Sequence, residues 1–428
     1  MGLPSPVVAA AAGAEGGGGR PRFEVADVVR AYGDEYLRTH PSTGAQRRVL
    51  RAIANCRTAA LGGHLQECDG CGQRRIAYNS CRNRHCPKCQ GKERARWMAA
   101  EQAMLLPVLY FHVVFTLPHA LNALLRANRR CLYGLLFRVV AATLRTFARD
   151  PRHLGAEPAV TMVLHTWGQT LPEHNHVHCV VSGGGLSLDG RSWIPLPTGK
   201  NKHRRPFLFP VTALSQVFRG KYIAALSRAR NNDELHFAGQ SETLADPVRW
   251  QELLDSLAHS DWVVYCKPPF GGPAQVLKYL SRYTHRVAIA NRRLLFVGNG
   301  VVRFSYRDYA DHNRTKEMTL PATEFLRRFL LHVVPPGFMR IRHYGITANR
   351  ERDHKLTRAR QLLGQRPLCQ PPPTGEEPAV ETVGASTTER STDPPTCPSC
   401  GGRLRVVEII PAPPRESSLR LPTPRDTS

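Results

Sequence analysis

The segment HNHVHCVV at residues 174–181 is the most informative part of this sequence for its fold. Successive side chains of a β-strand point to opposite faces, so His174, His176 and His178 share one face. The apolar side chains at positions 177, 179 and 181 share the other face, where they can pack against a hydrophobic core. The stretch therefore predicts a strand with one buried apolar face and one face that presents a row of imidazoles.

His176 and His178 are candidate ligands of a catalytic divalent ion. Two protein ligands leave coordination positions for a third side chain, a water and a phosphate oxygen. His174 and Gln169 are candidates for the third ligand, and His165 on the preceding predicted strand is a weaker one. Imidazole suits Zn²⁺ or Mn²⁺, whereas a substrate phosphate would supply the oxygens that Mg²⁺ prefers. Hydrogen-bonded core histidines and a zinc hydrolase are the competing interpretations, but the usual acidic ligand of a zinc hydrolase does not follow nearby.

Apolar, β-branched stretches around this segment extend it into a sheet. Residues 109–117 and 159–167 are predicted strands, and the glycines at 183–185 are expected to end the histidine strand. The order of elements predicts an α+β fold, an antiparallel sheet with flanking helices. The other predicted elements are helices at 119–148, 212–230, 274–285 and 325–334, a strand at 262–266, and a hairpin at 294–297 and 301–306.

Two tyrosines lie in the stretch VLKYLSRYTHRVAI at residues 276–289. Tyr279 and Tyr283 are four residues apart, so they share a face of the predicted helix. Two aromatic residues at this spacing are often core residues. Beside a metal site, however, a tyrosine hydroxyl is a competent nucleophile, and neighbouring cations favour its phenolate. The neighbouring cations are Lys278, Arg282 and Arg286.

Cysteines cluster near the N-terminus, where six of the twelve fall between Cys56 and Cys89. The pairs Cys68/Cys71 and Cys86/Cys89 each have the two-residue gap of a metal knuckle, and together they predict one tetrahedral Zn²⁺ site in a reducing compartment. A second zinc ion held by Cys56, His64, Cys81 and His85 is an alternative, as is a cluster of thiols without metal.

The chain is strongly basic, with 428 residues, a net charge of +25 and a pI of about 10.1. Such a balance favours a polyanionic partner, with nucleic acid as the first candidate and an acidic membrane surface as the second. Arg82, Arg84 and Lys88 surround the cysteine cluster and are expected to contact DNA phosphates, together with Lys278, Arg282 and Arg286. No run reaches the ~18 apolar residues of a membrane-spanning helix, so we expect no membrane partner.

The composition predicts a division of the chain into successive parts. The tail contains Cys397 and Cys400, half of a zinc ribbon, and only Cys369 is near enough in sequence to help complete a site. The expected parts are a disordered leader (1–22), a helical zinc-binding and DNA-binding domain (23–100), a core domain (105–290), the basic C-terminal part of the core domain (291–366), and a disordered linker and tail (367–428). The second helix of the zinc-binding domain is expected to begin with a capping box of Thr43 and Gln46.

These motifs together resemble a known family. The segment His176-Val-His178 resembles the histidine–hydrophobic–histidine (HUH) motif, and Tyr279-x-x-x-Tyr283 resembles the paired tyrosines of two-tyrosine HUH nucleases. The segment SCRNRHCPKCQ resembles the zinc-binding domain of rolling-circle transposases of the insertion-sequence-ninety-one type. The resemblance extends through YFHVVFTLPH, HTWGQTL, FRGK and MRIRHYGITANR, and covers roughly residues 25–366.

The resemblance implies a mechanism and a fold. HUH enzymes have an antiparallel sheet with the histidines on a central strand, and they nick single-stranded DNA through a 5′-phosphotyrosine. It implies that His176 and His178 bind catalytic Mg²⁺ or Mn²⁺ and that Tyr279 and Tyr283 are nucleophiles. It further implies that the cysteine pairs bind structural Zn²⁺, with Cys81 close to that site. It also implies a bacterial cytoplasmic enzyme with DNA as partner and neither a nucleotide cofactor nor a small-molecule substrate. A plasmid or phage replication initiator, a relaxase and a non-catalytic zinc-containing DNA-binding protein are the alternatives.

Overall fold

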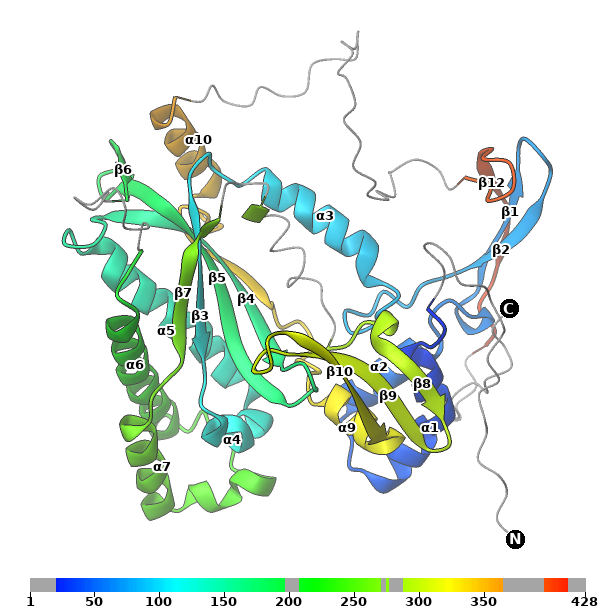
Figure 1. The fold of residues 1–428 in the computed structure, drawn as a ribbon, viewed down its shortest axis with the longest axis horizontal. Coiled ribbons are helices and arrows are strands. Elements are labelled where there is room, and N and C mark those ends of the chain that lie inside the picture. Colours follow the sequence, from blue (N-terminus) through cyan, green and yellow to red (C-terminus); the bar gives the residue numbers. More distant parts are fainter. Residues whose placement is uncertain (1–20, 197–207, 271–274, 277–287, 365–395, 415–428) are drawn as a thin grey trace.

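The computed structural model describes residues 21–196, 208–270, 275–276, 288–364 and 396–414. These residues form a central six-stranded sheet, a second unit of helices around a three-stranded sheet, and a third, small three-stranded sheet (Figure 1). The fold is therefore mixed helix and antiparallel sheet, as the sequence predicts, and it is consistent with an HUH-like architecture.

The central sheet has the histidine strand in its middle. Its order is β11-β4-β5-β3-β7, with every neighbouring pair antiparallel, and β6 pairs with the far end of β5. The register places His176 opposite Thr116 on one side and His165 on the other. The strands are β3 (Tyr110–Thr116), β4 (Ala156–Trp167), β5 (Glu173–Ser187), β6 (Trp193–Pro195), β7 (Val264–Phe270) and β11 (Ile341–Gly345).

The three glycines at 183–185 do not end the histidine strand, contrary to the sequence prediction. β5 continues through them to Ser187, because they allow neighbouring backbones to approach closely. A Cβ atom added to Gly185 would lie 2.4 Å from the carbonyl oxygen of Glu157 on β4, a distance that no side chain can occupy. Glycine in this strand therefore marks a tight strand contact.

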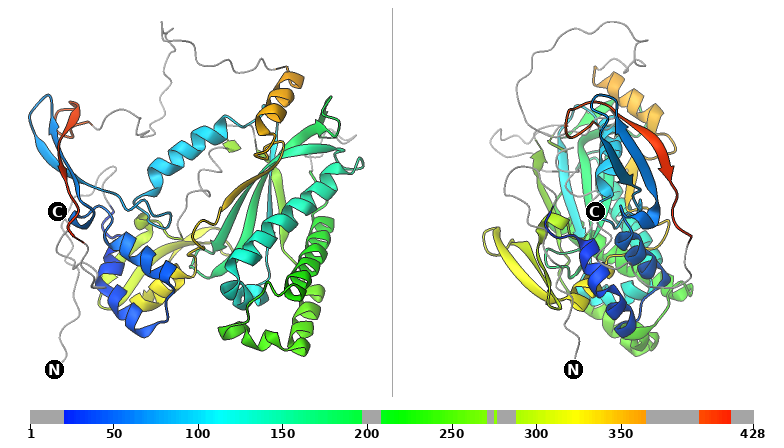
Figure 2. Two further views of the ribbon diagram at one scale, coloured as in Figure 1. Left: turned by 180° about the vertical axis from the view of Figure 1, so that it is seen from behind. Right: turned by 90° about the vertical axis from the view of Figure 1, so that its right-hand side faces the viewer.

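Helices cover the apolar face of the sheet. The buried core joins Val177, Cys179 and Val181 of β5 with aromatic side chains such as Phe137 and Phe218 on two long helices. Figure 2 shows these helices along one side of the sheet. They are α5 (Arg129–Arg149) and α6 (Val211–Asn231), followed by the 3-10 turn Gly239–Ala245 and α7 (Pro247–His259).

The helix predicted over residues 119–148 is interrupted. A 3-10 turn (His119–Leu121) and α4 (Asn122–Ala127) precede α5, and the break falls at Asn128. The Asn128 side-chain amide donates to the carbonyl of His236 and accepts from its backbone N–H, both at 2.7 Å. This pair of bonds fixes the non-helical backbone of Asn128.

Within the described part of the chain, α5 alone is long and apolar enough to span a membrane. Two-thirds of its most apolar window (67%) is buried inside the fold. Packing against the central sheet therefore accounts for its apolar character.

The second unit combines the beginning of the chain with residues after 290. Buried side chains of α1 and α2, such as Val29 and Leu50, share one core with Phe304 and Phe325. Thr43 and Gln46 form the predicted capping box of α2. The elements are α1 (Val25–Thr39), α2 (Gly44–Ala54), the 3-10 turn Asn291–Arg293, β8 (Leu294–Gly298), β9 (Val301–Asp308), β10 (Arg314–Pro321) and α9 (Ala322–Leu330).

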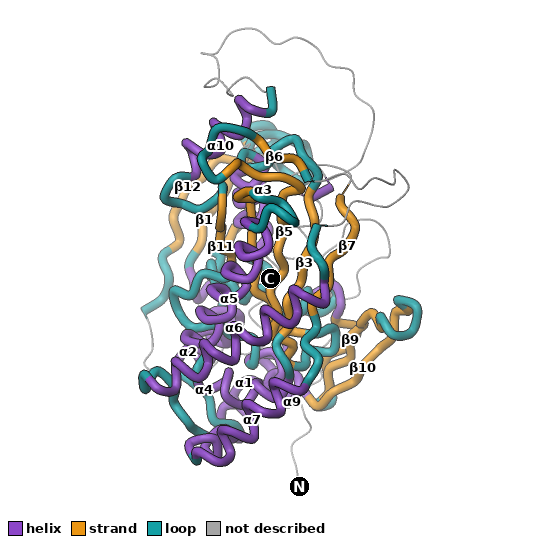
Figure 3. The backbone as a smooth tube through the Cα atoms, turned by 90° about the vertical axis from the view of Figure 1, so that its left-hand side faces the viewer, coloured by secondary structure: helices purple, strands orange, loops and turns teal. Residues whose placement is uncertain are grey.

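The third sheet joins the N-terminal cysteine region to the tail. β12 (Leu404–Ile410) pairs with β1 (Gly63–Cys68), which follows the 3-10 turn Ala59–Leu61 and pairs with β2 (Arg74–Tyr78). The composition of residues 367–428 predicts disorder throughout, and this prediction is wrong for β12. Among the described helices, α3 (Gln90–Gln102) and α10 (Arg352–Leu362) lie toward the upper end of the central sheet (Figure 3).

Candidate active site and metal centres

Three histidines converge on the face of the central sheet opposite the helical core. His176 and His178 come from β5 and His165 comes from β4, and one ring nitrogen of each lies within 4.8 Å of the others. The Nε2 atoms of His176 and His178 are 3.0 Å apart. Two nitrogens bound to one ion at ~2.1 Å and at angles between octahedral and tetrahedral lie about 3.0–3.4 Å apart, so this pair fits a shared metal ion.

Hydrogen bonds orient both strand histidines toward that point. His176 Nδ1 donates to the carbonyl oxygen of His174 at 2.7 Å, which leaves Nε2 of the neutral ring with its lone pair available. His178 Nδ1 lies 2.8 Å from Nε2 of His112 on the neighbouring strand β3. A second histidine that orients a ligating histidine in this way is a typical outer-shell partner of a metal site.

Burial keeps these imidazoles neutral. It lowers the pKa of His176 to about 3 and that of His112 to about 3, and it lowers the pKa of His178 well below its usual range. Neighbouring imidazoles add to the effect, because each would repel a second positive charge. Neutral imidazole is the form that binds metal, so the cluster suits a divalent ion at neutral pH.

The third member of the cluster is His165, the weaker candidate of the sequence analysis. The register opposes His165 to His176, and its ring centroid lies 4.4 Å from that of His178. The preferred candidates have other contacts. His174 Nδ1 lies 3.4 Å from His119 Nε2, and the Gln169 side-chain amide donates to the Tyr309 hydroxyl at 3.0 Å. The register between β4 and β5 places His165 in the cluster instead of His174 or Gln169. The alternation of side chains along a single strand does not reveal that register.

The tyrosines and their basic neighbours lie outside the described residues. These are Tyr279, Tyr283, Lys278, Arg282 and Arg286. The described residue Val276, three positions before Tyr279, is fully buried against Tyr110 and Val180. By strand alternation, Tyr110 and Val180 belong to the same sheet face as the histidines.

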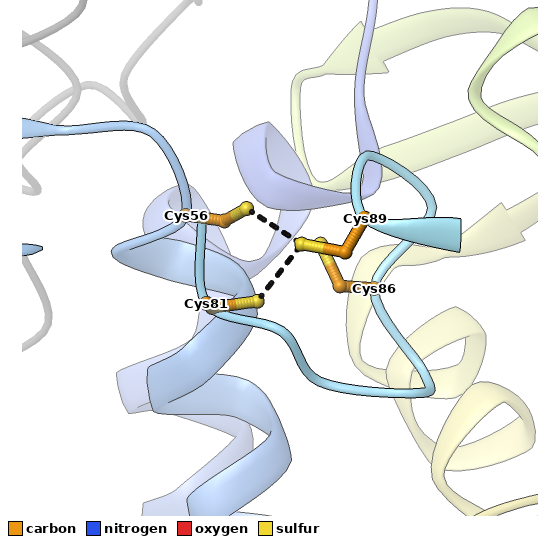
Figure 4. Close-up of side chains that lie close together, drawn as sticks. All are labelled: Cys56, Cys81, Cys86 and Cys89. Atoms are coloured by element: carbon orange, nitrogen blue, oxygen red, sulfur yellow. Dashed lines mark hydrogen bonds between the residues drawn. The ribbon is translucent and has the colours of Figure 1, made fainter. Parts of the chain in front are cut away.

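The first cysteine cluster contains Cys56, Cys81, Cys86 and Cys89 (Figure 4). The Sγ atom of Cys89 lies 3.3 Å from that of Cys56 and 3.5 Å from that of Cys81. Four sulfurs around one Zn²⁺ at ~2.3 Å lie about 3.8 Å apart, so the arrangement approaches a zinc tetrahedron and is too wide for disulfides. Hydrogen bonds among the four thiols lower the pKa of Cys89 and raise that of Cys86, because the neighbouring S–H groups stabilise a thiolate at Cys89.

The prediction of one site from both cysteine pairs is wrong. Cys68 and Cys71 lie at the turn of the β1–β2 hairpin, which carries them away from Cys86 and Cys89, and they join Cys397 and Cys400 of the tail. The alternative site that combined cysteines with His64 and His85 is wrong as well. Its two thiols, Cys56 and Cys81, complete the first cluster, so the described residues contain two separate four-cysteine groups.

The basic residues near the first cluster are partly engaged inside the fold. Arg84 donates to the carbonyl of Phe338 at 2.6 Å, and Lys88 forms an ion pair with Glu24. Arg82 is exposed. Of the three predicted phosphate contacts in this loop, Arg82 is therefore the one that the structure presents to solvent.

These features define an α+β protein with an HUH-like sheet and a cysteine-rich, zinc-binding N-terminal region. A family model described as "Putative transposase" matches residues 159–355, and one described as "Transposase zinc-binding domain" matches residues 28–117. The first match contains the histidine cluster, and the second contains the first cysteine cluster.

Two curated relatives cover most of the chain. "Putative transposase y4qJ" of Sinorhizobium fredii is 48% identical over 92% of this chain and 97% of its own length. "Transposase for insertion sequence element IS801" of Pseudomonas savastanoi pv. phaseolicola is 28% identical over 83% of this chain and 82% of its own length. No solved structure matches.

The chain belongs to the IS91-type transposases. It is therefore an enzyme whose partner is DNA, and the family membership favours a transposase over a replication initiator, a relaxase or a non-catalytic regulator. The zinc-binding domain and the cysteine clusters support Zn²⁺ as a bound ion.

Proposed function

We propose that this transposase nicks and joins single-stranded DNA at the ends of its element by rolling-circle chemistry, through a 5′-phosphotyrosine intermediate. The observation that carries the proposal is the cluster of His165, His176 and His178 on the central sheet. The sequence supplies the nucleophiles, Tyr279 and Tyr283, just after Val276, which packs on that same face.

The proposed reaction exchanges one phosphoester bond for another. The hydroxyl of Tyr279 or Tyr283 loses its proton and attacks the scissile phosphorus, a Tyr–O–P bond forms, and the P–O bond to the 3′ oxygen breaks. The 3′ oxygen takes up a proton and leaves as a free hydroxyl. Attack by a 3′ hydroxyl on the phosphotyrosine reverses the exchange and joins strands, so no nucleotide cofactor is required.

The chain's own residues prepare the site for this reaction. The histidines would hold a Mg²⁺ or Mn²⁺ ion, which when bound polarises the phosphate and withdraws charge from the leaving oxygen. Burial keeps His176 neutral, and His112 orients the ring of His178. Two tyrosines allow a second strand to be cut while the first is held, and the cations Lys278, Arg282 and Arg286 would stabilise charge on the phosphate. We place this activity in the bacterial cytoplasm, where the element DNA lies.

The test is formation of a covalent protein–DNA adduct. Single-stranded oligonucleotides spanning each end of the element, labelled 3′ of the nick, are incubated with the full chain and Mg²⁺ or Mn²⁺. We expect a metal-dependent labelled adduct that the Tyr279→Phe/Tyr283→Phe double variant and the His176→Ala/His178→Ala double variant do not form.

Matched controls are Tyr309→Phe and His259→Ala, which change an exposed tyrosine and an exposed histidine outside the cluster. Both controls should form the adduct at the rate of the parent. An adduct that persists in the double tyrosine variant, or that forms in chelator, would contradict the proposal.

A further inference from the structure

The second cysteine cluster joins the N-terminal region of the chain to its C-terminal tail. Cys68 and Cys71 come from the β1–β2 hairpin, and Cys397 and Cys400 come from the tail. The Sγ atoms of Cys68 and Cys400 are 3.4 Å apart, and those of Cys71 and Cys397 are 3.7 Å apart. These spacings approach the ~3.8 Å edge of a four-thiolate zinc tetrahedron.

In each cysteine pair, backbone N–H groups of the turn point at the first sulfur. The N–H groups of Cys71 and Gly70 point at the Cys68 sulfur. In the tail, the N–H groups of Ser399 and Cys400 point at the Cys397 sulfur. Hydrogen bonds from backbone amides favour the charged form of a thiol, which is the form that binds metal.

The residue at position 402 packs so closely against the sulfurs of the cluster that it must be a glycine. A Cβ atom added to Gly402 would lie 2.9 Å from the Cys68 sulfur and 3.3 Å from the Cys400 sulfur. The N–H of Gly402 lies 3.4 Å from the Cys400 sulfur, and its carbonyl accepts from the N–H of Cys397 at 2.7 Å. Gly402 therefore closes the tail knuckle against the hairpin knuckle.

Strand pairing and ion pairs also hold the tail against the β1–β2 hairpin. β12 runs antiparallel to β1, from the pair Cys68–Leu404 onward. Arg405 on β12 forms ion pairs with Glu67 at 2.6 Å and with Asp69 at 3.1 Å. The tail is thus aligned with the hairpin by backbone and side-chain contacts that extend away from the sulfurs.

Hydrophobic burial contributes little to holding this small sheet together. Its core cluster consists of Cys68, Cys397 and Leu404 alone, while Ile76 and Ile409 on its strands are 51% and 71% exposed. A sheet with so small a core needs a cross-link to remain folded, and bound zinc is a common cross-link of this kind.

We propose that Cys68, Cys71, Cys397 and Cys400 bind a second structural Zn²⁺ and form a zinc ribbon that requires the C-terminal tail. The matched zinc-binding domain ends at residue 117, so two of the four ligands lie outside it. The proposal is independent of the strand-transfer chemistry, because it concerns a metal that is remote from the histidine cluster in sequence and sheet.

The test counts zinc ions in the purified full chain. Elemental analysis follows dialysis into metal-free buffer, with His176→Ala/His178→Ala as the background so that the histidine cluster does not contribute. The Cys397→Ser/Cys400→Ser variant should lose one zinc equivalent per chain, and a chain ending at residue 396 should lose the same amount. The Cys86→Ser/Cys89→Ser variant should also lose one, from the other cluster.

The matched control is Cys131→Ser/Cys266→Ser, which removes two cysteines that belong to neither cluster and should keep all zinc. A second measurement is the absorption of the Co²⁺-substituted chain, whose tetrahedral thiolate signal should fall by half in Cys397→Ser/Cys400→Ser. Full retention of zinc and of the cobalt signal in that variant would overturn the proposal.

Discussion

The histidine cluster and the tail-completed cysteine cluster are both sets of metal donors, but the fold supports them very differently. The histidines lie on the central sheet, with buried side chains and a large core on the opposite face. The second cysteine cluster lies on a sheet whose core has three residues. The difference predicts that strand pairing orders the histidine site without a metal, whereas the proposed ribbon depends on bound zinc for its order.

Removing the strand histidines should have the largest effect on activity and little effect on folding. We expect His176→Ala/His178→Ala to abolish adduct formation, because the remaining ring of His165 cannot hold the ion alone. Circular dichroism should show unchanged secondary structure, since the core lies on the other face of the sheet. Loss of the folded state instead would show that the cluster is a structural element of the sheet.

Removing the residue that orients His178 should have a smaller effect. The His112→Phe variant keeps a ring in place but loses the 2.8 Å contact with His178. We expect activity or metal affinity to fall by about 10- to 100-fold, the usual cost of losing an outer-shell partner, and excess Mn²⁺ should restore part of the rate. His236→Phe, at an exposed position, is the control. Equal rates for both variants would show that His112 has no role in orienting His178.

The ribbon should respond to metal removal before the rest of the molecule does. A chelator should accelerate tryptic cleavage at Arg74 and Arg405, while cleavage in α5 stays slow because that helix belongs to the main core. Cleavage rates are followed by mass spectrometry, with the zinc-reloaded chain as the control. If the ribbon and α5 became sensitive to trypsin at the same rate, the ribbon would not depend on its metal more than the main core does.

How far sequence predicts this molecule depends on the range of each interaction. Alternation along one strand identifies the histidine face, and the Thr43–Gln46 spacing identifies a helix start, because both are local. The partner of Cys68 is Cys400, 332 positions later in sequence, and no local pattern connects them. For the same reason, the sequence ranks His165 below His174 and Gln169 and does not reveal the helix break at Asn128. A strand register positions His165, and a distant contact with His236 fixes Asn128.

The smallest expected effect is a loss of stability at low pH, which we expect from a buried histidine in the well-packed part of the fold. His332 is buried, its Nε2 donates to the carbonyl of Leu171, and burial lowers its pKa from 6.5 to about 3. The unfolded chain binds the proton first as pH falls, so His332 should cost stability below pH 6.5, by up to about 1.4 kcal/mol per pH unit. The effect is absent above pH 6.5.

Denaturant unfolding of the parent and of His332→Gln between pH 7 and pH 4 measures this contribution. The variant should lose less stability over that range than the parent does. Parallel pH profiles for the two chains would mean that His332 takes up its proton equally in the folded and unfolded states.

Identification of the DNA-linked residue is the decisive test of the phosphotyrosine mechanism. The adduct formed on a single-stranded element end is digested, and the peptide that carries the nucleotide is sequenced by mass spectrometry. The account predicts attachment through Tyr279 or Tyr283, dependent on a divalent ion and on His176 and His178. Attachment to any other residue, or strand cleavage that leaves no residue linked to DNA, would contradict it.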